Sequence, residues 1–449
     1  MSTDSWSSRM AFYLVAIGAA VGLGTVWRFP YLAGQYGSAF ITLFILVCAL
    51  IATPILAAEF LLGRRGRGSP PAAARDVATS AGLAPAWSIV GWLGSIAMFL
   101  VMAYYSVIGG WVLAYIGHFA AGNLGGLDAV AIGLRFDALL ADPWKLTLWH
   151  TLFMGATVLT SAVGLERGIE LANRIMVPGL FALLVALVVY ALFEGDFERA
   201  LPFLLRVDWS MIDANMVLLA VGQAFFATGV AMGIMMAYGA YVPRDVPLLR
   251  SGAVISTAII VASILVSLVI FPLAFRYGVD PSQGPRLAFV ILPTIFSGMP
   301  GGQLAGFAFF VLLAFAALSS AIAGLEPLAA VLRERLAWPR PRAVCVTGFG
   351  AWFLGLAVVL SFNHWQDVRP LAGIPGLGRR GIFDALDYVS ANLMLPLGAL
   401  LICILVAWRL PRQYLSEELG FSGLQLSIYR LLIGVLCPLA IAAMFLANL

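Results

Sequence analysis

The sequence predicts an all-α polytopic membrane protein with about eleven transmembrane helices. Its composition is 62% hydrophobic and only 11% charged, whereas about 25% of the residues of a soluble domain are charged. The mean hydropathy over the chain is +0.98. Apolar stretches recur from end to end, and many exceed the roughly 18 residues that mark a spanning helix. We therefore expect the lipid bilayer, and no nucleic acid, as the chain's partner.

Hydropathy windows place the spanning segments in order along the chain. They cover residues 10–35, 38–63, 86–121, 144–163, 168–193, 213–241, 249–277, 303–335, 341–363, 381–408 and 424–447. No segment has the composition of a soluble domain or a low-complexity linker, and the N-terminus lacks the pattern of a cleavable signal. We expect one transmembrane domain over residues 1–449.

Arginine distribution predicts the orientation of this domain. Alternate loops are rich in arginine, and loops of this kind stay in the cytoplasm. These loops contain Arg64, Arg65, Arg67, Arg75, Arg167, Arg174, Arg244, Arg250, Arg333, Arg335, Arg340, Arg342, Arg409 and Arg412. The pattern favours a cytoplasmic N-terminus in the inner (plasma) membrane of a bacterial-type cell. An odd number of helices then places the C-terminus outside.

Two glycine-rich stretches, residues 18–25 and 223–233, stand inside apolar segments. Glycine costs about 1 kcal/mol relative to alanine within a helix, so such clusters indicate unwinding or close helix packing. Each cluster lies in the first helix of a five-helix half, over residues 10–193 and 213–408, with 424–447 as an extra helix. Broken helices at matching places in two inverted repeats are typical of a transporter's central site. Their freed carbonyls can bind a cation, and their freed amides a carboxylate.

The residues in these segments resemble the neurotransmitter:sodium symporter family, in its bacterial eleven-helix amino-acid transporter branch. The matching stretches occur in the family's order across nearly the whole chain. They are Trp6–Arg9, Gly22–Tyr31, Pro54 with Glu59 and Gly63, Tyr104 with Tyr105 and Trp111, Gly222–Phe226, Leu292 with Pro293, Leu318–Ser320, and Asp384 with Asp387. The resemblance implies the leucine-transporter fold, with discontinuous helices one and six, and transport by alternating access.

The resemblance implies Na⁺ as the coupling ion. The family's second sodium site corresponds to five positions that offer neutral oxygens: the carbonyls of Gly18, Val21 and Ala316 and the hydroxyls of Ser319 and Ser320. Read without the resemblance, the two serine hydroxyls fit equally with bonds to helix carbonyls one turn earlier.

The family's first sodium site corresponds to Thr25, Ala227 and Ile259. Only Thr25 keeps an oxygen-bearing side chain, so we expect coupling to one sodium ion. The counterparts of the family's chloride ligands are Phe44 and Ser263, which do not form a complete chloride site.

The resemblance also implies a substrate pocket for a small amine-bearing solute, with a neutral, apolar or aromatic amino acid favoured. Gly22 stands where carriers of monoamines have an aspartate and leaves room for a carboxylate. The implied pocket residues are Ala20, Leu23, Gly24, Val101, Tyr105, Phe226, Ala227, Gly229, Met232, Ser320 and Gly324. In this arrangement the Tyr105 hydroxyl and the Leu23 and Gly24 amides bind the carboxylate.

Charged residues inside the membrane are costly and usually functional. By resemblance, Arg28 and Asp387 form the outer gate with Gln223 nearby, and Glu59 supports the broken sixth helix. The resemblance further assigns an inner gate to Trp6, Tyr241 and Glu334. Glu326 matches none of the family's roles.

The sequence therefore predicts a sodium-coupled secondary symporter and no enzyme, since no Ser–His pair or H-E-x-x-H motif occurs. Two alternatives remain open. One is a solute sensor that keeps the fold without transporting. The other is a carrier of a non-standard amino acid or amine with one-sodium coupling.

Overall fold

A computed structural model describes residues 5–279, 287–374 and 378–447. Within these ranges the regular structure is helical throughout, and nine helices are long and apolar enough to cross a membrane. These helices are Gly24–Gly66, Pro85–Ala120, Pro143–Val163, Leu165–Glu194, Leu248–Arg276, Gly302–Leu336, Arg340–Ser361, Ile382–Arg409 and Gly423–Leu446. The chain is a polytopic membrane protein, as its composition predicts.

The nine long helices in the described residues correspond to the eleven predicted segments. The first segment is broken and its second half joins the second segment, and the sixth segment is broken into two short helices. The helix over 24–66 holds the second half of the first segment and the whole second segment, joined at Gly37, whose φ of 63° bends the chain. The first half of that first segment is the separate helix α1 (Arg9–Ala20). The sixth segment is divided into α10 (Ala214–Thr228) and α11 (Ile234–Gly239).

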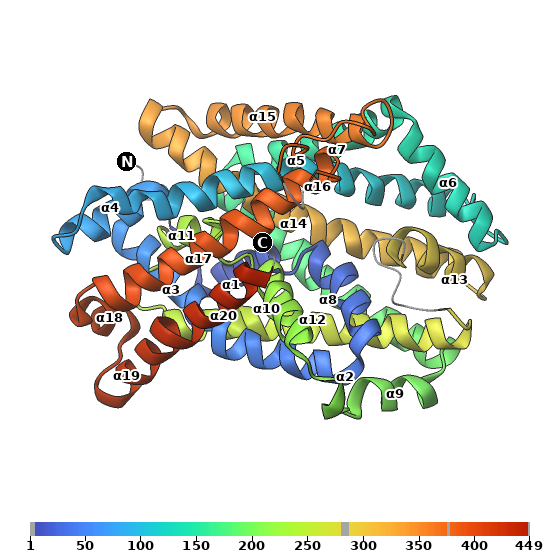
Figure 1. Ribbon diagram of the computed structural model, residues 1–449. Coiled ribbons are helices and arrows are strands. Elements are labelled where there is room, and N and C mark those ends of the chain that lie inside the picture. The colour runs from blue at the N-terminus through green and yellow to red at the C-terminus, as the bar shows by residue number, and fades with distance from the viewer. Residues whose placement is uncertain (1–4, 280–286, 375–377, 448–449) are drawn as a thin grey trace.

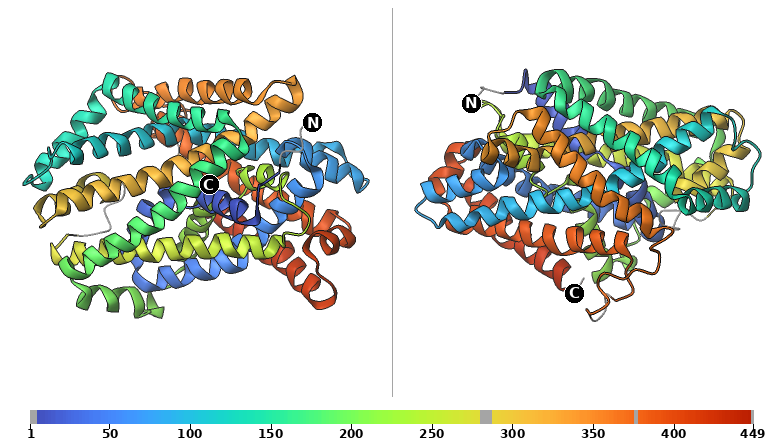
Figure 2. Two further views of the ribbon diagram at one scale, coloured as in Figure 1. Left: turned by 180° about the vertical axis from the view of Figure 1, so that it is seen from behind. Right: turned by 90° about the horizontal axis from the view of Figure 1, so that it is seen from above.

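The long helices run roughly side by side, as Figures 1 and 2 show. α5 (Ile89–Ala120) and α14 (Gly302–Leu336) pack against each other, and α7 (Pro143–Val163) packs on both. α15 (Arg340–Ser361) lies along one edge of the bundle, and α2 (Phe29–Val47) and α9 (Phe197–Leu205) lie along the opposite edge (Figure 1).

Glycines set the close spacing of these helices, as is common in membranes. A Cβ atom on Gly306 of α14 would lie 2.1 Å from the Phe119 ring of α5. A Cβ atom on Gly109 of α5 would lie 2.6 Å from the Phe153 ring of α7. Larger residues at either position would separate the helices that surround the centre of the bundle.

The remaining helices complete the bundle and its two ends. They are α3 (Thr53–Gly66), α4 (Pro70–Ser80), α6 (Ala129–Ala141), α8 (Leu171–Glu194), α12 (Leu248–Arg276), α13 (Leu292–Gly298), α16 (Ile382–Asp387), α17 (Leu395–Ile404), α18 (Arg412–Leu419), α19 (Gly423–Leu431) and α20 (Cys437–Ala447). Helices α4, α18 and α19 lie at one end of the bundle, and α6 and α13 lie at the other (Figure 1).

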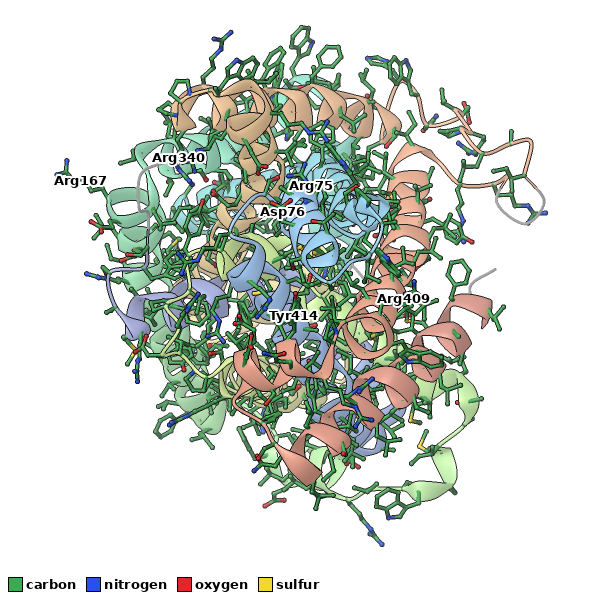
Figure 3. All side chains as sticks on the ribbon, turned by 90° about the vertical axis from the view of Figure 1, so that its left-hand side faces the viewer. Arg75, Asp76, Arg167, Arg340, Arg409 and Tyr414 are labelled. Atoms are coloured by element: carbon green, nitrogen blue, oxygen red, sulfur yellow. The ribbon has the colours of Figure 1, made fainter. Side chains whose placement is uncertain are left out.

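Arginines from separate connecting segments lie at one end of the molecule. Figure 3 views this end and shows Arg75, Arg167, Arg340 and Arg409 together on it. The sequence predicts all four in loops on the same side of the membrane. The bundle therefore has an arginine-bearing end, consistent with the predicted alternation of loops.

Both predicted helix breaks are present. Helix α1 ends at Ala20, residues 21–22 are not helical, and a π-helical turn over Gly24–Arg28 follows. In the sixth segment, residues 229–233 separate α10 from α11, with positive φ at Gly229, Ala231 and Gly233. Ala231 has a φ of 63°, which is strained for a residue with a side chain. The discontinuous helices one and six are confirmed.

Candidate substrate and sodium site

A small cavity of about 40 Å³ lies where the two breaks meet. Its walls come from the break in the first segment, from α5, from the break in the sixth segment and from α14. All the predicted pocket residues except Gly324 line it, joined by Ala19, Gly22, Thr25, Met98 and Ile234. A cavity of this size holds only a few water molecules, so an organic substrate requires movement of the walls.

Gly22 lines the cavity close to two hydroxyl groups. A Cβ atom at this position would lie 2.7 Å from the Ser320 hydroxyl and 3.1 Å from the Tyr105 hydroxyl. A side chain at Gly22 would therefore have to displace these hydroxyls. The Tyr105 hydroxyl accepts a hydrogen bond from the Leu23 amide, with 3.3 Å between oxygen and nitrogen. The two groups predicted to bind a carboxylate thus lie next to each other.

Part of the cavity wall is formed by flexible sulfur-containing side chains. Met98 and Met232 line the cavity. Gly324 lies behind them, because a Cβ atom there would be 2.4 Å from the Met98 methyl group and 2.7 Å from the Met102 sulfur. Methionine adapts its shape at low cost. The cavity can therefore enlarge at this part of the wall, and Gly324 gives the methionines room to move.

The predicted second sodium site brings its groups together beside the cavity. The Ser320 hydroxyl donates to the Gly18 carbonyl at 3.1 Å, which joins α14 to α1. The Ser319 hydroxyl donates to the Ala316 carbonyl at 3.1 Å. Ser319 is buried and Ser320 is 9% exposed. These neutral oxygens suit a hard monovalent cation, so the donor set fits Na⁺.

Val21, the fifth predicted ligand, belongs to the non-helical break. Its backbone N–H donates to the Ile17 carbonyl, and its ψ of 81° is far from the helical value. The Val21 carbonyl is therefore turned out of the helical hydrogen-bond pattern, as a ligand from an unwound segment requires.

Two of the three residues at the predicted first sodium site have apolar side chains. Ala227 and Ile259 are buried and offer no side-chain oxygen. The Thr25 hydroxyl is buried and has no hydrogen-bond partner among the described residues. The positions that correspond to the family's chloride ligands hold Phe44 and Ser263. The Phe44 ring packs at a tilt of 57° against Phe29, with 4.7 Å between ring centroids, and the Ser263 hydroxyl has no hydrogen-bond partner among the described residues.

The predicted outer gate residues contact one another's neighbours beside the cavity. The guanidinium of Arg28 lies 5.2 Å from the centre of the Phe226 ring, which lines the cavity. Asp387 accepts a hydrogen bond from the Tyr104 hydroxyl at 3.1 Å and interacts electrostatically with Arg28. The Gln223 amide donates to the Gly24 carbonyl at 2.9 Å and so ties α10 to the first break.

The predicted inner gate residues fall into two groups. The Trp6 ring packs edge-on against Tyr241, with 5.9 Å between centroids, and its N–H donates to the Tyr238 carbonyl. Glu334 instead accepts a hydrogen bond from the Ser69 amide at 2.8 Å, at the start of α4. Trp6 therefore joins Tyr241 directly, whereas Glu334 ties α14 to a neighbouring loop.

Glu59 is fully buried in α3 and faces the backbone of Ala231 and Gly233, in the break of the sixth segment. Neither carboxylate oxygen has a hydrogen bond of standard geometry in the described residues. The close approach of α3 to this region is fixed by Gly63, where a Cβ atom would lie 2.0 Å from the Met236 carbonyl. This placement agrees with the supporting role predicted for Glu59.

The structure adds a buried ion pair that sequence reasoning missed. Glu326 accepts hydrogen bonds from two nitrogens of Arg340, at 3.0 and 2.5 Å, and from the Tyr241 hydroxyl at 3.2 Å. Arg340 also donates to the Ser161 carbonyl at 3.0 Å. The pair connects α14, α15 and α7 directly behind Tyr241.

A second missed contact holds the N-terminal segment. The amide and hydroxyl of Ser7 both donate to the carboxylate of Glu170, at 2.9 and 2.5 Å, and Arg174 donates to the Ser7 hydroxyl at 2.8 Å. Nearby, Arg9 pairs with Asp245 in the loop before α12, and this hydrogen bond lowers the pKa of the Asp245 carboxyl. The sequence signal was an acidic residue, Glu170, at the end of a membrane segment.

A bundle of membrane helices with two breaks around a central cavity defines a secondary transporter. The chain matches the Sodium:neurotransmitter symporter family over residues 3–125 and 134–449 and belongs to that family. It is 34% identical to the sodium-dependent transporter YhdH of Bacillus subtilis, covering 98% of this chain and 96% of that protein. It is 30% identical to a sodium-dependent transporter of Haemophilus influenzae, covering 99% and 98%.

The fold is also similar to that of a solved structure. The crystal structure of MhsT in complex with L-phenylalanine superimposes with a TM-score of 0.89 at 35% identity, covering 99% of this chain and all of that one. The family and the structural neighbour are transporters and not enzymes. The chain is therefore a multi-pass, sodium-coupled membrane transporter, as the sequence predicts.

Proposed function

We propose that this chain is a sodium-coupled symporter of a neutral amino acid with an apolar or aromatic side chain. The observation that carries the proposal is the cavity at the two helix breaks. One side offers Tyr105 and the Leu23 amide for a carboxylate, and the other side offers Met98 and Met232 for an apolar side chain. The similarity to MhsT, which was crystallised with L-phenylalanine, supports this substrate class.

The amine of the substrate is best accommodated by backbone carbonyls. The break over residues 229–233 leaves several peptide groups outside helical hydrogen bonding, and such carbonyls bind an ammonium group. A monoamine without a carboxylate is disfavoured, because Gly22 offers no counter-charge and the space beside it is filled by Ser320 and Tyr105.

Sodium then binds at the second site and drives transport. Ser319, Ser320 and the carbonyls of Gly18, Val21 and Ala316 are the proposed ligands. One sodium ion per substrate is proposed, because Ala227 and Ile259 present only apolar side chains at the first position. A cation there would lack ligands in a low-dielectric environment. The arginine-bearing end of the bundle (Figure 3) supports a cytoplasmic location for that end, with the N-terminus inside.

The test is uptake by proteoliposomes that contain the purified chain. We expect phenylalanine, tryptophan or leucine to accumulate under an inward sodium gradient and not in choline buffer. Phenethylamine, which lacks the carboxylate, serves as the matched control and is not expected to accumulate. Tyr105→Phe removes the hydroxyl and is expected to weaken apparent affinity about tenfold. Binding without uptake would favour a sensor, and uptake without sodium would contradict the proposal.

Stoichiometry is tested in the same vesicles. We expect a Hill coefficient near one for sodium at limiting substrate and a sodium-to-substrate flux ratio near one. A measured flux ratio of two would show that Thr25 and backbone carbonyls still form a working first site.

A further inference from the structure

Three arginines at the arginine-bearing end of the bundle lack carboxylate partners among the described residues. Arg409 ends the helical segment that follows α17, Arg412 begins α18, and Arg430 lies in α19. None forms an ion pair within the described parts of the chain. Arg412 and Arg430 are close enough to repel each other. Figure 3 shows Arg409 on the side of this end that lies away from Arg167.

The acidic residues of α18 cannot neutralise this cluster, because other arginines already bind them. Glu418 pairs with Arg64 at 2.7 Å, and Glu417 pairs with Arg65 at 2.9 Å. The guanidinium of Arg65 also lies 3.5 Å from the centre of the Tyr414 ring. These contacts hold α18 against α3. They thereby fix the position of Arg412, the first residue of α18.

Arg430 is oriented by a single hydrogen bond. It donates to the Ala407 carbonyl at 2.7 Å, one of the free carbonyls at the end of that helical segment. A guanidinium has five N–H donors, so most of its donors remain for a ligand. Fork-shaped donor groups of this kind bind phosphate oxygens in pairs.

The surroundings of the cluster belong to the membrane interface. Trp408 precedes Arg409, is 67% exposed and donates to the Gly434 carbonyl at 2.9 Å. Tryptophan prefers the level of the lipid headgroups. Leu424, Ile428 and Leu431 of α19 are exposed apolar residues, which is the surface expected against lipid acyl chains.

We propose that Arg409, Arg412 and Arg430 form a binding site for the phosphate of an anionic phospholipid, with its acyl chains along α19. The ligand is a membrane lipid and not a free phosphate, because α19 carries both Arg430 and the exposed apolar residues Leu424, Ile428 and Leu431. This site is separate from the substrate cavity, and the inference does not depend on which solute is carried.

The experiment reports on lipid contact at Trp408. The protein is placed in nanodiscs with about 20 mol% of lipid carrying brominated, fluorescence-quenching acyl chains, as either phosphatidylglycerol or phosphatidylcholine. The quenching that disappears in Trp408→Phe is assigned to Trp408. Each basic residue near an anionic membrane surface strengthens binding to that surface about fivefold. Three arginines together favour the anionic lipid about a hundredfold, which nearly fills the site at about 20 mol%, so we expect brominated phosphatidylglycerol to quench Trp408 about five times more than brominated phosphatidylcholine.

Two triple variants distinguish the site from diffuse attraction by the whole end. Arg409→Gln/Arg412→Gln/Arg430→Gln should bring the quenching ratio to about one. The matched control, Arg167→Gln/Arg335→Gln/Arg342→Gln, removes the same charge elsewhere and should leave the ratio unchanged. Arg412→Gln alone, at the start of an exposed helix, tests the idea if the first triple variant does not fold, and should lower the ratio.

Three outcomes would overturn the proposal. A ratio near one in the parent would show no preference for anionic lipid. An equal fall in both triple variants would show that total charge, and not this cluster, matters. Loss of the quenching difference on adding soluble glycerol phosphate would identify a free phosphate as the ligand.

Discussion

The ion pair between Glu326 and Arg340 allows a prediction whose size follows from its burial. The Glu326 side chain is 1% exposed and the Arg340 side chain is 11% exposed. Removing one partner of a buried pair leaves an uncompensated charge and costs about 3–5 kcal/mol. Glu326→Gln should therefore destabilise the fold by about this amount. With an unfolding entropy of about 2.1 cal/mol/K per residue, a chain of 449 residues loses roughly 1 °C for each kcal/mol.

Thermal unfolding in detergent, followed by tryptophan fluorescence, measures the effect. We expect Glu326→Gln and Arg340→Gln each to lower the melting temperature by about 3–5 °C. The double variant Glu326→Gln/Arg340→Gln should be less affected than the sum of the two, because no buried charge remains. Arg75→Gln, which breaks the half-exposed pair with Asp76, is the matched control and should shift it by less than about 1 °C. Strictly additive losses, or single variants as stable as Arg75→Gln, would refute the reasoning.

Three further predictions concern transport. Ser320→Ala removes a ligand from the second sodium site and should raise the sodium concentration for half-maximal uptake about tenfold to a hundredfold; unchanged sodium dependence would contradict this assignment. Asp387→Asn should slow uptake more than it weakens substrate binding, since Asp387 and Tyr104 meet at the predicted outer gate, and a scintillation binding assay separates the two effects. Glu170→Gln removes the charge that Ser7 contacts and should increase the labelling, in sodium, of a cysteine introduced by Ser5→Cys, because the N-terminal segment has no cysteine of its own; equal labelling with and without Glu170→Gln would show that this contact does not hold the segment.

Sequence reasoning located the helix breaks because their signal is local. Clustered glycines weaken a helix wherever they occur, so Gly18–Thr25 and Gln223–Gly233 mark the breaks without knowledge of any neighbour. The spanning segments are similarly visible, since the bilayer requires long apolar helices. The division between the first two predicted segments, at residues 36–37, coincides with the kink at Gly37, where the backbone leaves the helical conformation without a connecting loop.

Contacts between segments could not be predicted in the same way. Glu326 and Arg340 are 14 residues apart across a turn, and nothing in their spacing shows that they face each other. Ser7 and Glu170 are separated by 163 residues. The family resemblance implied that Gly324 lines the cavity, whereas Met98 and Met102 pack against it in the structure. These errors and omissions all concern rotation and packing of helices, which depend on the whole bundle.

The proposed coupling between ion and substrate follows from Ser320, because this side chain belongs to both sites. Its hydroxyl bonds to the Gly18 carbonyl and also lies where a side chain on Gly22 would be. A sodium ion that recruits Ser320 and Gly18 as ligands holds α14 against the end of α1. The same contact fixes the non-helical residues from which Leu23 reaches Tyr105. Sodium therefore favours the substrate site by ordering the first break, even when it does not touch the substrate. By linkage the substrate must strengthen sodium binding by the same factor.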